Sequence, residues 1–187
     1  MLNQKEFDNF NKKQIKIVNR AAEMAEEIVS DYYKLSSSQW LRRRYDIKTL
    51  ADLSPEEIVN GPFAQIIRYK AHPKDSCLGS SAYDFYKICL QDNSILAVIS
   101  DFKAIKLCPF TLYIITHELI HIVRFSEFIQ NFNASHEEKL AEETRVHNNT
   151  HEILKSIKLP GLSNVLKFYD KWRVPVDKFD ELHLQGA

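Results

Sequence analysis

The chain reads ITHELIHIV at residues 115–123, which contains the pattern H-E-x-x-H from His117 to His121. On a helix, residues four apart lie one turn above each other on the same face. Two imidazoles at that spacing can bind one divalent metal ion, and a Glu beside the first of them can act as general base toward a water molecule that the metal activates. The sequence therefore predicts a metal site at His117 and His121, with Glu118 as its base.

The residues around this motif indicate a buried helix. From Ile114 to Val123 every residue except Glu118 is uncharged, within a helix predicted over about residues 110–132. Polar groups that are buried without partners are costly, and a metal ion is the simplest partner for two such histidines. The alternative is a pair of core histidines that are hydrogen-bonded to backbone or carboxylate groups.

The motif resembles that of the zincin metallopeptidases, and the resemblance covers the motif helix and the helix after it. Zincins need a third protein ligand. In the metzincin class a Gly and a third His follow the motif closely, where this chain has Arg124 and Glu127. In the gluzincin class the ligand is a Glu on a second helix. The resemblance implies a zinc-dependent, peptidase-like hydrolase of the gluzincin kind.

Four acids fall where that Glu is expected, and a helical wheel discriminates among them. With about 100° per residue, Glu143 lies inside the apolar face of a helix predicted over 135–158, and Glu142 lies on the edge of that face. The residues that define the face are Leu140, Val146, Ile153, Leu154 and Ile157. We therefore expect Glu143 to be the third metal ligand, and Glu142 is the alternative candidate for this ligand.

His147 and His151 follow Glu143 at intervals of four on the same face. We expect the ring of His147 to face the metal site, where two roles are open. It can stabilise a transition-state oxyanion, which makes it a catalytic candidate beside Glu118. It can also be a fourth protein ligand, in which case no water position remains and the metal is structural.

Two functions from different classes follow from these residues. The first is a zinc-dependent hydrolase for a peptide or small-molecule substrate, with His117, His121 and Glu143 as ligands. The second is a non-catalytic metal-binding or interaction protein in which the same metal site is structural and only stabilises the fold. One Zn²⁺ ion is the expected cofactor, although His and carboxylate ligands suit iron and manganese as well.

Few chain breakers interrupt the sequence, which has four glycines and six prolines, so long helices are expected. We predict a mainly helical α+β fold that consists of a zincin-like helix pair, a small β-hairpin or sheet and a long N-terminal helix. We expect an N-terminal helical part at 1–70 and a metal-site part at 71–187, within one compact domain. The predicted helices are 4–35, 54–69, 110–132, 135–158 and 163–172, and the predicted strands are 83–90 and 95–100, followed by an extended tail from 174.

Two of these elements carry further expectations. The second strand, 95–100, is the candidate for the strand that lines the cleft in zincins. The apolar stripe of the 4–35 helix packs within its own domain, or forms the seam of a homodimer because its pattern is close to a heptad.

Composition excludes several classes of protein. Twenty-five Lys and Arg balance 25 Asp and Glu in 187 residues, so we expect neither a nucleic-acid partner nor a polybasic membrane surface. No apolar run is long enough to span a bilayer. The first residues, MLNQKE, lack the apolar core of a signal peptide, and the three cysteines form no C-x-x-C pair. We therefore expect a cytoplasmic protein.

Overall fold

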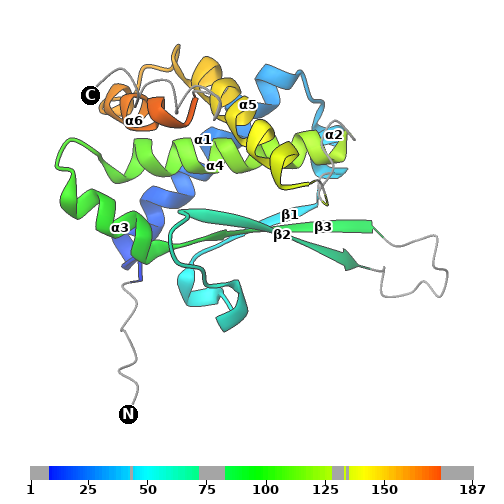
Figure 1. Cartoon of the computed structure of the whole chain (residues 1–187), viewed down its shortest axis with the longest axis horizontal. Coiled ribbons are helices and arrows are strands. Elements are labelled where there is room, and N and C mark those ends of the chain that lie inside the picture. The colour runs from blue at the N-terminus through cyan, green and yellow to red at the C-terminus, as the bar shows by residue number, and fades with distance from the viewer. Residues whose placement is uncertain (1–8, 43, 72–82, 128–132, 134, 174–187) are drawn as a thin grey trace.

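The computed structural model describes residues 9–42, 44–71, 83–127, 133 and 135–173 (Figure 1). The expected fold class is confirmed, because the described part of the chain is mainly helical, contains one three-stranded sheet and has a long N-terminal helix. The helices are α1 (Lys12–Tyr33), α2 (Ser37–Arg42), α3 (Asp92–Asp101), α4 (Leu107–Ser126), α5 (His136–Leu154) and α6 (Leu162–Tyr169). The strands are β1 (Tyr45–Lys48), β2 (Ala64–Ala71) and β3 (Tyr83–Leu90), and the short 3₁₀ turns are η1 (Leu50–Asp52), η2 (Pro55–Glu57) and η4 (Asp170–Arg173).

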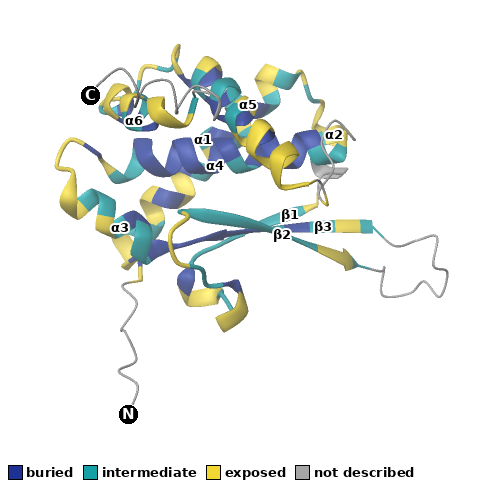
Figure 2. Cartoon of the chain, in the orientation of Figure 1, coloured by how far each residue is buried: buried dark blue, intermediate teal, exposed yellow. Residues whose placement is uncertain are grey.

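The central element of the described fold is α4. A helix that is apolar on nearly all sides has to be buried on all sides, and α4 is buried along most of its length (Figure 2). α1, α5 and α6 pack around it, and β2 contacts it from the sheet. Neither α4 nor any other helix in the described ranges combines the length and apolarity that a membrane crossing needs. The helix that carries H-E-x-x-H is thus fixed by the protein core.

The helix expected at 4–35 begins at Lys12, because Asn11 and Gln14 form a capping box there; residues 1–8 lie outside the described part. Its buried stripe packs along α4, so the stripe is used within the chain. The residues of that stripe are Val18, Ala21, Ala25 and Val29. A homodimer through this helix stays a prediction, and it would need a different face of α1.

The described sheet has the strand order β1-β3-β2, with β1 parallel and β2 antiparallel to β3. In this register Ile66 lies opposite Ile88. The strand order makes β2 an edge strand, and its first residues line one cleft together with His117, Glu118 and His121 of α4. The part expected at 1–70 and the part expected at 71–187 are joined by the pairing of β2 with β3. Residues 72–82, between these two strands in the sequence, lie outside the described part.

The helix predicted over 54–69 is wrong. Its expected start exists, since Ser54 and Glu57 form a capping box, but only the single turn η2 follows. Gly61 has a φ of 108°, a conformation that L side chains rarely adopt, and Pro62 follows it. These two residues end any helix, and the chain continues as β2.

The strand predicted over 95–100 is also wrong, because these residues belong to α3. The polar run before them resembles a turn but opens the helix. The buried carboxylate of Asp92 accepts the backbone N–H groups of Phe10 and Leu50 at 2.9 and 3.0 Å, which anchors the start of α3 to two distant segments. The predicted strand at 83–90 is correct, but its hairpin partner is β2.

The remaining helices agree with the prediction apart from their ends. The helix predicted over 110–132 is α4, which starts earlier, and residues 128–132 lie outside the described part. The helix predicted over 135–158 is α5, which ends at Leu154. The last predicted helix is α6 with η4, and the tail from 174 is not among the described residues.

A buried acid on η2 links this turn to the sheet. The carboxylate of Glu57 accepts hydrogen bonds from Lys87 Nζ at 2.5 Å, Tyr69 Oη at 2.7 Å and the Ser54 backbone N–H at 2.9 Å. These donors, Lys87 first, lower the pKa of Glu57 to about 2. Because its folded-state pKa is depressed, Glu57 stabilises the fold above its ordinary pKa of 4.5, and this contribution is lost as the pH falls toward 2.

We predict that Glu57→Gln lowers the free energy of unfolding by about 1–3 kcal/mol at neutral pH, as expected when hydrogen bonds to a charged group are lost. The deficit should shrink as the pH is lowered from 4.5 toward 2. Urea unfolding at pH 7 and pH 3 measures both effects. Glu56→Gln, at the exposed neighbouring acid, is the matched control. Equal losses in the two variants at pH 7 would contradict the assignment.

Candidate metal centre

α4 brings the two histidines of the motif together. His117 and His121 are both buried, and their Nε2 atoms lie 3.2 Å apart. The i, i+4 spacing sets this arrangement, because it aligns the two rings on one face of a helix. Tyr113 occupies the same face one turn before His117. The motif thus presents its nitrogen atoms from a rigid, buried element.

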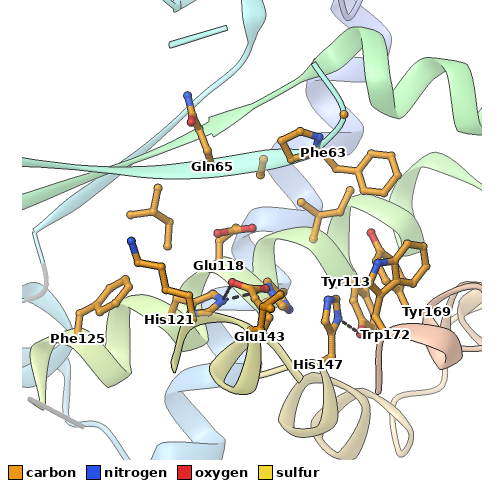
Figure 3. Close-up of a pocket in the computed structure, with 18 residues that line it drawn as sticks. Phe63, Gln65, Tyr113, Glu118, His121, Phe125, Glu143, His147, Tyr169 and Trp172 are labelled. Carbon is orange, nitrogen blue, oxygen red and sulfur yellow. Dashed lines mark hydrogen bonds and ion pairs between the residues drawn. The ribbon is translucent and has the colours of Figure 1, made fainter. Parts of the chain in front are cut away.

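α5 supplies the third member of the group. It starts at the capping box of Ser135 and Glu138 and runs back over α4 (Figure 1). Its Glu143 places one carboxylate oxygen 3.2 Å from His117 Nε2 and the other 3.2 Å from His121 Nε2 (Figure 3). The structure thus brings together His117, His121 and Glu143, which are called the metal centre below.

The donor atoms of the metal centre fit a metal ion. An imidazole nitrogen that carries no proton and a carboxylate oxygen are both acceptors, so a cation between them could take the place of the protons that now join Glu143 to His117 and His121. Two ligands about 2.0–2.1 Å from a tetrahedral zinc ion lie about 3.3 Å apart, close to the three separations of 3.2 Å seen here. Two His and one Glu form a common donor set for catalytic zinc. The Nε2 atom of His117 hydrogen-bonds to Glu143 and His121, but its buried Nδ1 atom has no hydrogen-bond partner in the described structure.

Electrostatics at Glu143 agree with its position. Partial burial by itself raises the pKa of its carboxyl group, but hydrogen bonds to His117 and His121 and the charge of those rings outweigh burial. The pKa lies below its ordinary value as a result. Glu143 is therefore an anion beside the two rings, which is the state that a metal ligand needs.

His147 lies one turn after Glu143 on α5, and its side chain is 9% exposed. His147, His117 and Glu143 each offer a ligand atom within 4.8 Å of the others. The Tyr113 hydroxyl hydrogen-bonds to Nδ1 of His147 at 2.9 Å, so Nε2 is the nitrogen available to the metal centre. Burial and the nearby charge of His117 lower the pKa of His147 to about 3, which keeps the ring neutral.

Glu118 lines the same cleft as the metal centre. Figure 3 shows its carboxylate in the cleft, on the side of the metal centre that faces β2. Burial raises the pKa of this carboxyl group, and the charges of His117 and His121 oppose the shift. A carboxylate with a raised pKa is a better proton acceptor than an ordinary one, as a general base requires.

The cleft has a volume of about 630 Å³ and is formed by four regions of the chain. The floor comes from α4 and one wall from α5. The segment from Gly61 to Ile66, which includes the start of β2, forms the opposite wall, and Tyr169 and Trp172 close one end. The strand expected to line the cleft, 95–100, is therefore replaced by β2. The size is typical of a site for a small molecule or a short peptide segment.

The helical wheel is wrong about which acid is buried. Glu142 is buried, whereas the side chain of Glu143 is 51% exposed. Arg124 of α4 pairs with Glu142 through its Nε atom, and Arg145 pairs with the same carboxylate. The ion pair with Arg124 holds Glu142 between the helices, while Glu143 is exposed because it faces an open cleft.

The other histidines that the structure describes, His136 and His151, do not join the metal centre. His151 is half-buried, it is absent from the cleft lining, and burial lowers its pKa. His136 is exposed at the start of α5, as expected for a residue near the helix cap. His72 and His183 lie outside the described residues.

Sequence reasoning missed several residues of the cleft. Tyr113 has a local signal, because it precedes His117 by four residues and so shares its face. Phe63, Tyr169 and Trp172 have no such signal, since only the folded chain brings them beside α4. Lys139 at the start of α5 also lines the cleft.

We predict that His147→Gln keeps the metal with less than about a tenfold loss of affinity, because three protein ligands remain. Competition with a chelator measures the affinity. In a zinc-loaded crystal structure we expect His147 Nε2 to lie beyond the bonding distance of about 2.0–2.1 Å. Bonding at that distance, together with loss of zinc from His147→Gln, would make His147 a ligand and the metal centre structural.

No protein-family model, curated protein or solved structure matches this chain.

Proposed function

We propose that this chain is a metal-dependent hydrolase, peptidase-like and zinc-dependent, with an arrangement similar to that of gluzincins. The observation that carries the proposal is the triangle of His117 Nε2, His121 Nε2 and the Glu143 carboxylate, with separations of 3.2 Å, next to Glu118 in one cleft. Structural metal sites are closed by protein ligands, whereas catalytic sites keep a position open. The metal centre lines a cleft and so leaves room for water and substrate.

Each residue has a distinct part in the reaction. His117, His121 and Glu143 hold the metal, which when bound supplies Lewis acidity and lowers the pKa of water. Glu118 accepts a proton from the attacking water and later passes it to the leaving group. His147 donates from Nε2 to the oxygen that becomes negative, provided that the Tyr113 hydroxyl donates to Nδ1 and so fixes this tautomer. The substrate lies along β2, above Glu118.

A structural metal site is the second candidate function. The observation that favours it is the position of His147, which groups with His117 and Glu143 within 4.8 Å. Four protein ligands would close the coordination sphere and exclude a reactive water. Zinc is the proposed ion for either function, and iron or manganese could use the same ligands.

The substrate is proposed to be a peptide or a small molecule, and not a nucleic acid, because the formal net charge is zero. We propose a cytoplasmic location because the sequence has an odd number of cysteines and no C-x-x-C pair. Cys89 and Cys108 are both free thiols in the described structure, in agreement with a reducing compartment.

Metal analysis of the purified protein tests the proposal first. We expect close to one zinc ion per chain, loss of peptide hydrolysis when a chelator removes it, and recovery when zinc is returned. If the purified protein contains much less than one metal ion per chain, and incubation with zinc, iron or manganese does not raise its metal content, both metal functions are rejected. Full metal occupancy without hydrolysis of any peptide in a mixed library would favour the structural function.

A further inference from the structure

The end of the cleft beside His147 is built from aromatic rings. This aromatic end consists of Phe63, Tyr113, Tyr169 and Trp172, which Figure 3 shows grouped on one side of the metal centre. Tyr113 and Tyr169 stack with ring centroids 3.9 Å apart, and Tyr169 lies 5.3 Å from Trp172. Each ring thus supports the next, so the aromatic end is a rigid surface.

Trp172 presents this surface to solvent. Its side chain is 37% exposed, whereas Tyr113 and Tyr169 are buried beneath it. The ammonium group of Lys171 lies over the indole, 4.1 Å from the centroid, and the ring of His147 lies 6.3 Å away in a nearly parallel orientation. An apolar side chain that is left partly open at the rim of a cleft is a ready contact surface for a ligand.

Among the residues that line the cleft, the charged ones lie outside the aromatic end; Lys171, which lies over the indole, is not one of the lining residues. Its charged lining residues are Glu118 and Glu143 at the metal centre and Lys139 on α5. Lys139 precedes His147 by eight residues, which places it about 12 Å away along the helix axis. None of the four residues of the aromatic end is charged, so an apolar or aromatic group can bind there without leaving a buried charge unpaired.

We infer that the aromatic end is a specificity subsite that binds an aromatic side chain of the substrate next to the bond to be cleaved. The exposed part of Trp172 and the half-buried ring of Phe63 can contact such a group, while Tyr169 supports Trp172 from beneath, and aromatic pairs are favourable beyond the area they bury. The subsite adjoins His147, so a residue bound there has its neighbouring carbonyl near the metal centre. The position of the cleaved bond rests on the proposed function, but the binding of the aromatic group does not.

The binding test uses the full chain and needs no metal. The protein has two tryptophans, Trp40 and Trp172, so its indole N–H groups give two signals in a ¹⁵N–¹H NMR spectrum. Titration with N-acetyl-phenylalaninamide should shift the Trp172 signal, with about tenfold tighter binding than N-acetyl-alaninamide, because a phenyl group buries more apolar area than a methyl group. Trp172→Ala and Trp172→Phe lack this signal, so calorimetric titration measures their affinities: Trp172→Ala should abolish the preference, and Trp172→Phe should retain part of it. Trp40→Phe is the matched control and should change nothing.

Two results would overturn the subsite. One is equal affinity for the two amides, and the other is a titration in which other signals shift but the Trp172 signal does not. A second measurement separates this failure from failure of the proposed function. With zinc-loaded protein, peptides that carry Phe beside the cleaved bond should have kcat/KM about tenfold above their Ala counterparts. Cleavage without this preference would reject the subsite and keep the hydrolase. Binding of the phenyl amide at Trp172 without cleavage would keep the subsite and reject the hydrolase.

Discussion

Glu118→Gln should keep the fold and the bound metal but lower the rate of hydrolysis by about 10²–10⁴-fold, the range expected for loss of a general base. The amide has the size of the carboxylate but cannot accept a proton at neutral pH. Glu118 is not one of the three residues of the metal centre, whose contacts join only His117, His121 and Glu143. The substitution therefore leaves the three proposed ligands in place. Metal content, circular dichroism and peptide cleavage measure the three quantities on one sample.

Glu127→Gln provides the matched control for this substitution. Glu127 lies at the end of α4, is exposed and does not line the cleft, so its loss should leave hydrolysis unchanged. Two results would contradict the proposed role of Glu118. Loss of metal from Glu118→Gln would make this residue a ligand. Unchanged hydrolysis would show that the proton is accepted elsewhere.

Glu143→Gln should weaken metal binding by more than about 100-fold, which exceeds the usual effect of changing a residue that only supports a ligand. A neutral amide replaces the anion that lies 3.2 Å from both histidines. The fold should change little, because the Glu143 side chain is half-exposed. Competition with a chelator of known affinity measures the loss.

The neighbouring acid provides a reciprocal control. Glu142→Gln should leave metal affinity within about threefold but destabilise the fold by about 3–5 kcal/mol, since Arg124 stays buried without its partner. Glu152→Gln, at an exposed acid on the same helix, should change neither quantity. Loss of metal from Glu142→Gln with retention by Glu143→Gln would mean that the two roles are reversed.

The sequence predicted the helices of the site well, because their signals are local. The H-E-x-x-H spacing and the uncharged residues around it define α4, and the capping box at Ser135 defines the start of α5. The wheel selected Glu143, which the structure places beside both histidines. It failed on the burial of Glu142, because that burial depends on Arg124, a residue on another helix. A wheel contains no information about partners in space.

The predictions that failed in the fold depended on longer-range effects. Residues 95–100 have the apolar, β-branched composition of a strand, but Asp92 anchors them as a helix through contacts with Phe10 and Leu50. Residues 64–71 become a strand because β3 pairs with them. The aromatic end of the cleft could not be predicted for the same reason, since α6 and η4 meet α4 only in the folded chain.

The burial of α4 has a consequence for the proposed binding of a metal ion. Backbone amides in such a helix exchange with solvent only when much of the protein opens. A ligand that binds only the native state stabilises the native state as a whole, by an amount that grows with its concentration relative to Kd. Because His117 and His121 belong to this helix, binding of the proposed metal ion would be thermodynamically linked to global unfolding rather than to the motion of a loop. Metal depletion would therefore shorten the lifetime of the entire polypeptide, including α1 and the sheet.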